Sequence, residues 1–66
     1  MKKQQVKAVS DIILNMIIIP KGSIGYRSRW SQRLKRLQST NCVCVRFPDY
    51  QRKSFVAAKE EVINID

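Results

Sequence analysis

Histidine is absent from this chain of 66 residues, which removes the side chain that most often moves protons near neutral pH. It also removes the imidazole that activates serine, cysteine and lysine nucleophiles, so no such residue here has a candidate activating base. The two cysteines, Cys42 and Cys44, cannot by themselves complete a zinc site with four ligands. We therefore predict that the protein is not an enzyme and that it carries no metal and no cofactor.

Cysteine is scarce, and long apolar runs are missing. Cys42 and Cys44 lie two residues apart, a spacing at which the thiols of one strand rarely reach disulfide geometry. Free thiols indicate a reducing compartment, and an intermolecular metal or redox role for the pair is the alternative. The most apolar segment, residues 12–19, is too short to span a bilayer, and no small-residue cleavage site follows it. These absences predict a cytoplasmic protein that has no membrane segment.

Acidic residues are few as well. Asp and Glu number five against thirteen Lys and Arg, which gives a formal net charge of +8. No acidic residue lies between Asp11 and Asp49, whereas seven of the cations do. A surface of one sign attracts polyanions and speeds association with acidic partners. The imbalance predicts nucleic acid or an acidic protein as the partner, and solubility alone is the plainer explanation.

Glycine and proline occur only twice each, so each one marks a particular place in the chain. Pro20 and Gly22 predict a turn that feeds an extended segment from residue 23 to 29. Pro48 predicts the turn that ends a second run, residues 42–47, rich in β-branched and aromatic residues. A chain of this length forms one small domain, residues 1–66, and buries only about 60% of its unfolded surface.

Residues 6–19 fit two patterns. Apolar residues recur there at helical spacing, at Val6, Val9, Ile13, Met16 and Ile17. Their β-branched character favours strands instead, with a first strand at residues 6–9 and a long apolar excursion at 11–19. Periodicity does not separate the two, and we favour the strands. We expect the excursion to fold back over one end of the core, and an exposed apolar patch is the alternative.

The remaining segments alternate more clearly. In residues 23–29, Ile24 and Tyr26 share one face, while Gly25, Arg27 and Arg29 share the other, which we expect to be the solvent face. In the run 42–47, the valines and Phe47 share a face opposite the cysteines and Arg46. Two more strands are predicted at 53–58, with Phe55 and Ala57 inward, and at 62–65. A tight turn at 59–61 separates them.

Residues 30–41 leave the predicted sheet. Trp30, Leu34 and Leu37 are spaced as one stripe of a helix, so we predict a short helical turn capped by Ser31. We expect this stripe to pack on the sheet, and Trp30 to be mainly buried, because large aromatic residues are scarce in so small a core.

The order of these segments resembles the SH3-like barrel superfamily. Residues 19–25 (Ile-Pro-Lys-Gly-Ser-Ile-Gly) resemble its glycine-bearing turn before the second strand, and residues 43–47 resemble its central strand. Residues 55–65 are similar to its closing pattern of strand, acidic turn and last strand, as found in a small peripheral photosystem I protein and in KOW-type barrels. The resemblance implies an all-β fold, a small five-stranded barrel with a long apolar first loop and a basic loop or helical turn between strands 2 and 3. The aromatic groove of proline-binding SH3 domains is not recognisable.

The basic segment is the strongest candidate for a binding site. Five of the ten residues from 27 to 36 are Lys or Arg, and an indole lies among them. Guanidinium groups pair with phosphate oxygens in bidentate fashion, and an exposed indole stacks on an unpaired base. Arg46 is expected on the outer face beside the Arg27 strand. The predicted nucleic-acid-binding residues are Arg27, Arg29, Trp30, Arg33, Lys35, Arg36 and Arg46.

These observations predict a small basic binding protein, an accessory or regulatory factor that contacts DNA or RNA through phosphates. The alternative is an adaptor or inhibitor that docks on an acidic protein surface of a larger assembly. A third possibility is a homo-oligomer that covers the apolar side chains of Ile12, Ile13, Leu14, Met16, Ile17, Ile18 and Ile19.

Overall fold

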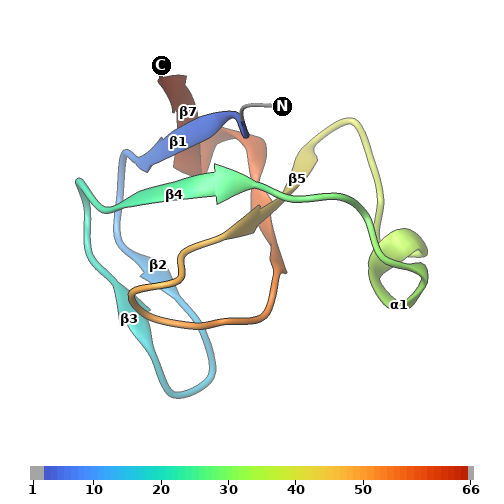
Figure 1. Cartoon of the computed structure of the whole chain (residues 1–66), viewed down its shortest axis with the longest axis horizontal. Coiled ribbons are helices and arrows are strands. Elements are labelled where there is room, and N and C mark those ends of the chain that lie inside the picture. The colour runs from blue at the N-terminus through green and yellow to red at the C-terminus, as the bar shows by residue number, and fades with distance from the viewer. Residues whose placement is uncertain (1–2, 66) are drawn as a thin grey trace.

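The computed structural model describes residues 3–65 and is built mainly of β-strands (Figure 1). Five strands form one antiparallel sheet in the order β6-β5-β4-β1-β7. They are β1 (Gln5–Ala8), β4 (Ile24–Arg27), β5 (Cys42–Arg46), β6 (Phe55–Ala58) and β7 (Val62–Ile65). The short strands β2 (Ile12–Ile13) and β3 (Ile18–Ile19) pair as a separate hairpin. A helical turn, α1 (Gln32–Lys35), precedes β5, and a 3₁₀ turn, η1 (Lys59–Glu61), joins β6 to β7.

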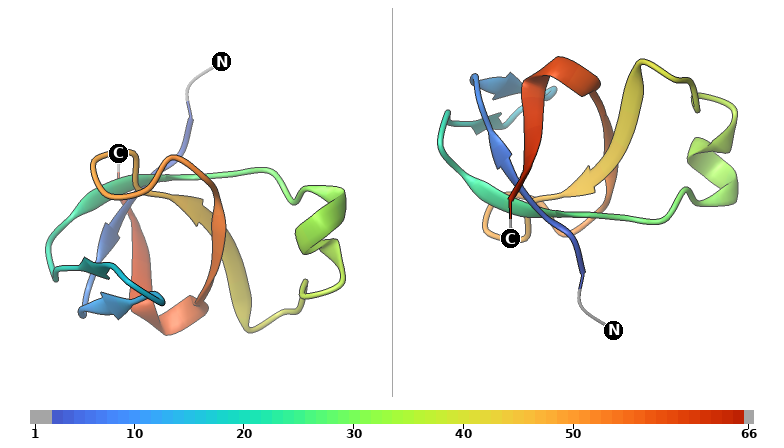
Figure 2. Two further views of the ribbon diagram at one scale, coloured as in Figure 1. Left: turned by 90° about the horizontal axis from the view of Figure 1, so that it is seen from below. Right: turned by 90° about the horizontal axis from the view of Figure 1, so that it is seen from above.

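The five-stranded sheet curls around a small core (Figure 2). The rings of Phe47 and Phe55 stack there with centroids 6.0 Å apart. Alternate residues of neighbouring strands supply the rest, because side chains along a strand point to opposite faces. The buried cluster consists of Val6, Ala8, Ile12, Ile19, Val45, Phe47, Phe55, Ala57 and Val62.

Residues 6–19 contain the end of β1 and the short strands β2 and β3 and no helix, as the β-branched residues favour. The hairpin both covers the core and exposes apolar surface, because its alternation sends Ile12 and Ile19 inward and their neighbours outward. Ile13 and Ile18 face each other across the hairpin and are 76% and 61% exposed, and Met16 at the turn is 94% exposed. The expectation that the excursion covers one end of the core is therefore met by only part of the segment.

The predicted faces of β4 are reversed. Gly25 is the buried residue of this strand, while Ile24 is 43% exposed and Tyr26 is half-buried. A Cβ atom at position 25 would lie 2.6 Å from the carbonyl oxygen of Arg46 and 2.7 Å from Cδ2 of Phe47. The glycine thus makes room for the Phe47 ring, and the larger neighbours turn outward. Hydrophobicity alone predicts the opposite orientation, because it does not account for the space that the Phe47 ring needs beside the β4 backbone.

The later strands agree with the sequence prediction. Val45 and Phe47 point inward from the β5 segment, and Phe55 and Ala57 do so from β6. The turn after Phe47 is closed by hydrogen bonds from the backbone N–H groups of Tyr50 and Gln51 to the Phe47 carbonyl, both 2.9 Å long. Within residues 3–65, no helix has both the length and the apolar character needed to cross a membrane.

We predict that Gly25→Ala lowers the free energy of unfolding by about 3 kcal/mol, because the new methyl group overlaps a backbone oxygen that cannot move aside. Gly22→Asn is the matched control. Gly22 has a φ of 91°, but no atom lies within 4 Å of a Cβ built there, so this change is expected to cost only about 1 kcal/mol. Urea denaturation followed by circular dichroism measures both. Equal stability of the two variants would contradict the packing described for Gly25.

Candidate nucleic-acid interface

The segment between β4 and β5, residues 28–41, projects from the sheet and is termed the basic arm. Figures 1 and 2 show α1 near its tip, well apart from the curled sheet. The helical turn forms where the sequence predicts it, because Ser31 caps it: the Ser31 hydroxyl accepts a hydrogen bond of 3.3 Å from the Leu34 N–H. The Ser31 carbonyl also accepts one of 2.8 Å from the Lys35 N–H.

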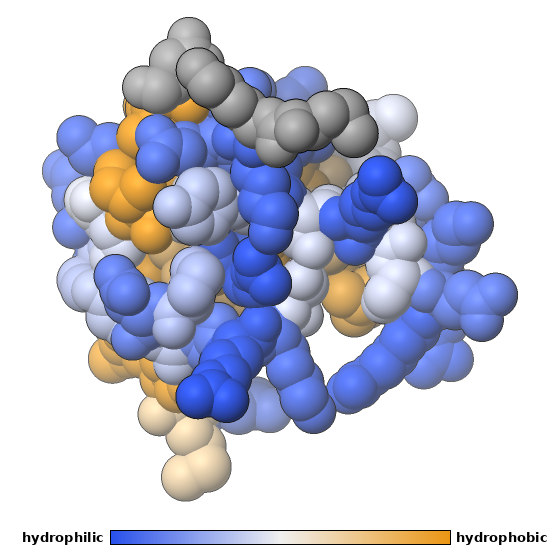
Figure 3. All heavy atoms as spheres, viewed as in Figure 1, coloured by the Kyte–Doolittle hydropathy of each residue, from blue (hydrophilic) through white to orange (hydrophobic). Residues whose placement is uncertain are grey.

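The cations of the arm face solvent. All four are exposed, and the arm contains no acidic residue to neutralise them. Figure 3 shows hydrophilic side chains reaching outward on the side of the molecule where α1 lies in Figure 1. These exposed side chains are Arg29, Arg33, Lys35 and Arg36.

Both ends of the arm are attached to the sheet. At the first end, the Ser28 N–H donates a 2.9 Å hydrogen bond to the Cys44 carbonyl, and the Ser28 and Ser54 hydroxyls lie 2.6 Å apart. The Cys44 thiol also donates a 3.6 Å hydrogen bond to the carbonyl oxygen of Arg29. At the second end, the Lys59 N–H donates a 2.8 Å hydrogen bond to the Asn41 carbonyl. The arm is thus a loop with fixed ends and a tip that is open to a partner.

The apolar stripe of the arm is less buried than the sequence predicts. Trp30 and Leu34 are half-buried, Leu37 is 54% exposed, and α1 contains no buried residue. The expectation that Trp30 is mainly buried is met, because well under half of its surface is exposed, whereas the expectation that the whole stripe packs on the sheet fails at Leu37. A single helical turn held away from the sheet has too little surface to cover these side chains. Part of the indole remains accessible to a ligand.

Arg27 and Arg46 lie on opposite faces of the sheet, contrary to the predicted single outer face. Arg46 pairs in register with Tyr26, whereas Arg27 pairs with Val45, whose side chain is buried in the core. Residues paired across neighbouring strands share a face, so Arg27 belongs to the inner face and Arg46 to the outer one. Arg27 is nevertheless exposed, because it ends β4 where the sheet opens. Arg27 and Arg46 therefore do not form one cationic face.

Arg27 has neighbours that sequence reasoning did not find. It borders a cavity of about 150 Å³ at the open end of the curled sheet, termed the valine cavity. Lys59 of η1 and Asn64 of β7 lie on its rim with Arg27, and its apolar lining consists of Val6, Val43 and Val62. No local pattern marks Lys59 or Asn64, because the pairing of β7 with β1 brings them there across the whole length of the chain.

Cys44 is 1% exposed and lies under the first residues of the arm. Burial raises the pKa of its thiol, and a hydrogen bond with Ser28 opposes this rise more weakly. The folded state therefore favours the neutral thiol. Its contribution to stability is fully present below the ordinary thiol pKa and is lost as the pH rises through that value and beyond.

Within the part of the chain that the structure describes, no three His, Cys, Asp or Glu side chains gather as a metal site would require. Comparisons with protein-family models, curated proteins and solved structures find no match to this chain.

We predict that the two thiols react differently because the arm covers only one. In the folded protein Cys42, which is half-buried, is expected to react with a disulfide reagent such as DTNB, whereas Cys44 reacts only after unfolding. Single Cys42→Ala and Cys44→Ala variants assign the two signals. Stability of the Cys44→Ala variant should also decline less than that of the parent protein above the ordinary thiol pKa. Fast labelling of Cys44 at neutral pH would contradict the attachment of the arm.

Proposed function

We propose that this protein is a small, non-enzymatic nucleic-acid-binding factor of accessory or regulatory type, and that it contacts phosphates through the basic arm. The observation that carries the proposal is the projection of four exposed cations on one loop that has no acidic neighbour along the chain (Figure 1). Cations spaced along a loop track a polyanionic backbone without reading its sequence. The fixed ends of the arm reduce the entropy lost on binding.

The chemistry of the arm favours phosphate over a carboxylate surface. Three of its four cations are arginines, whose planar guanidinium groups donate paired hydrogen bonds to phosphate oxygens. The partly accessible Trp30 lies among them and offers a surface on which an unpaired base stacks. An acidic protein surface would use the same charges but would leave the indole without a planar partner.

We also propose that the curled sheet is an SH3-like barrel. The strand order supports this. β4, β5 and β6 are consecutive neighbours in the sheet, and β1 lies between β4 and the last strand, β7. The hairpin β2–β3 occupies the long first loop, the basic arm occupies the loop between the second and third barrel strands, and η1 precedes the last strand. The fold provides a frame for the arm and by itself carries no function.

We predict that the double variant Arg33→Gln/Arg36→Gln binds nucleic acid more weakly at every sequence tested. Loss of two phosphate contacts should reduce the slope of log affinity against log salt by about 1.4 for single strands, at about 0.7 for each contact. Fluorescence anisotropy at a series of salt concentrations measures the slope.

The matched control is Lys7→Gln/Lys21→Gln, which removes the same charge from exposed positions outside the arm. Its slope should stay close to that of the parent protein. An equal reduction in both variants would refute the arm as the site, and an affinity that does not depend on salt would refute the proposal. Capture of one protein partner that survives nuclease treatment would instead favour the adaptor alternative.

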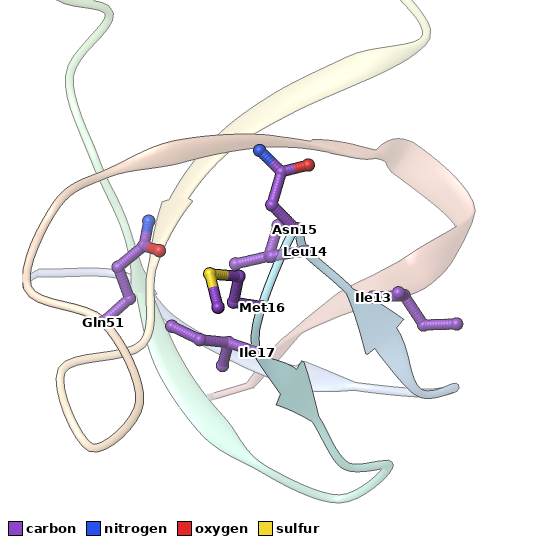
Figure 4. Close-up of a pocket in the computed structure, with 6 residues that line it drawn as sticks. All are labelled: Ile13, Leu14, Asn15, Met16, Ile17 and Gln51. Carbon is purple, nitrogen blue, oxygen red and sulfur yellow. The ribbon is translucent and has the colours of Figure 1, made fainter.

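A second candidate function rests on the hairpin β2–β3, which lies on the side of the molecule away from the arm (Figures 1 and 2). Its exposed apolar residues are Ile13, Met16 and Ile18. Leu14, Asn15, Met16 and Ile17 line a hollow with Gln51, and Met16 and Ile17 extend toward the loop that carries Gln51 (Figure 4). No charged residue lies between Asp11 and Lys21. Two copies could therefore meet at the hairpin without burying a charge, so we propose self-association there.

We predict that the protein then has twice the chain mass of 7.7 kDa in light scattering, and that Met16→Lys/Ile18→Lys restores the single chain mass. Ile63→Lys is the control, because Ile63 is also exposed, at 50%, but lies on β7. A parent protein that stays at the single chain mass at high concentration would contradict this candidate and leave the basic arm unaffected.

A further inference from the structure

The valine cavity joins apolar lining and positive charge in one place. Val43 is half-buried and Val62 is 7% exposed, so these two side chains supply the apolar surface that a ligand reaches, whereas Val6 is fully buried. The polar residues of the lining are Arg27, Lys59 and Asn64, and all three are exposed. A ligand that fits this arrangement has a compact apolar body, a negative group beside it and polar atoms on one edge.

The size of the cavity limits that body. Its volume is about 150 Å³. An apolar cavity of roughly this size in a protein core accommodates one benzene molecule. A single six-membered ring therefore fits, whereas the fused double ring of a purine would have to project over the rim.

The position of the cavity connects it to the basic arm. Arg27 is the last residue of β4, and the arm begins at the next residue. At the other end of the arm, the backbone of Asn41 is bonded to that of Lys59 on the cavity rim. A nucleic-acid strand whose phosphates follow the arm therefore passes residues of the cavity lining at both ends of the arm.

The acidic side chains next to the rim do not fill the cavity. Glu61 follows Lys59 by two residues, and its Oε1 accepts a 2.9 Å hydrogen bond from the backbone N–H of Ala58. This bond directs the carboxylate toward the start of η1, and Glu61 is not part of the cavity lining. The exposed Glu60, next to Lys59, is not part of the lining either, so Arg27 and Lys59 are the charged residues that line the cavity.

We propose that the valine cavity binds one unpaired pyrimidine base of a single-stranded nucleic acid. The ring lies against Val43 and Val62, the Asn64 amide pairs with the polar edge of the base, and Arg27 and Lys59 contact the flanking phosphates. This inference rests on the proposed function of the basic arm and adds to it a preference for single strands and for pyrimidines. A paired base cannot enter, because its edge is occupied by its partner and its faces are stacked.

The test uses the full chain with a short single-stranded oligothymidylate, an oligoadenylate of equal length and the duplex of the two, each followed by fluorescence anisotropy. Oligothymidylate is expected to bind roughly tenfold more tightly than either of the others. Asn64→Phe places the phenylalanine ring over the cavity. It should remove the preference for oligothymidylate while the arm still binds oligothymidylate, oligoadenylate and the duplex. Asn64→Asp, which keeps the shape and adds a negative charge, should do the same.

A second pair of variants tests the role of the positive charge at Lys59. Lys59→Gln should weaken oligothymidylate binding, whereas Lys7→Gln should not, because Lys7 alternates with the buried Val6 and Ala8 and lies on the outer face. A preference for oligothymidylate that survives both Asn64 variants would overturn the inference, since self-stacking of adenine strands would then be its source. Loss of affinity in Lys59→Gln and Lys7→Gln alike would also overturn it.

Methyl and amide NMR separates this inference from the proposed function. On addition of oligothymidylate, the methyl signals of Val6, Val43 and Val62 and the amide signals of residues 28–41 are both expected to shift. Shifts confined to the arm would overturn the cavity assignment and leave the arm as the binding site. No shift in either region would overturn both proposals.

Discussion

The close approach of β4 to the Phe47 ring is the contact on which the rest of the structure depends. It exists because residue 25 has no side chain: a Cβ there would lie 2.6 Å from the Arg46 carbonyl oxygen. With Gly25 facing inward, the alternation of β4 puts Arg27 on the inner face, at the open end of the sheet. The same alternation turns Ile24 outward to an exposure of 43%. A single missing methyl group therefore decides where the first guanidinium of the basic segment lies.

The structure separates apolar and cationic surface. The hairpin, with exposed Ile13, Met16 and Ile18, lies on one side of the sheet, and the basic arm lies on another (Figure 1). This separation fits a protein that holds a polyanion on one side and leaves the other free for protein contacts.

The attachments of the arm restrict the conformations open to this loop. Its backbone is hydrogen-bonded to the sheet at Ser28 and again at Asn41, and one capped helical turn shortens the free part between them. Part of the entropy of ordering is therefore lost on folding and need not be lost again on binding. The same attachments bury Cys44, so its reactivity reports whether the arm is in place.

The sequence by itself determined the strand content, the helical turn capped by Ser31, the inward residues of β5 and β6 and the excess of positive charge. These are local properties, set by side-chain alternation, capping and composition over a few residues. Only the tertiary structure decided that Gly25 faces inward, that Arg46 and Arg27 lie on opposite faces, and that Leu37 is exposed. It alone brought Lys59 and Asn64 beside Arg27, because that meeting depends on the pairing of β1 with both β4 and β7. Pairing between distant strands and the space that a glycine leaves are properties of the assembled core, and no short stretch of the chain encodes them.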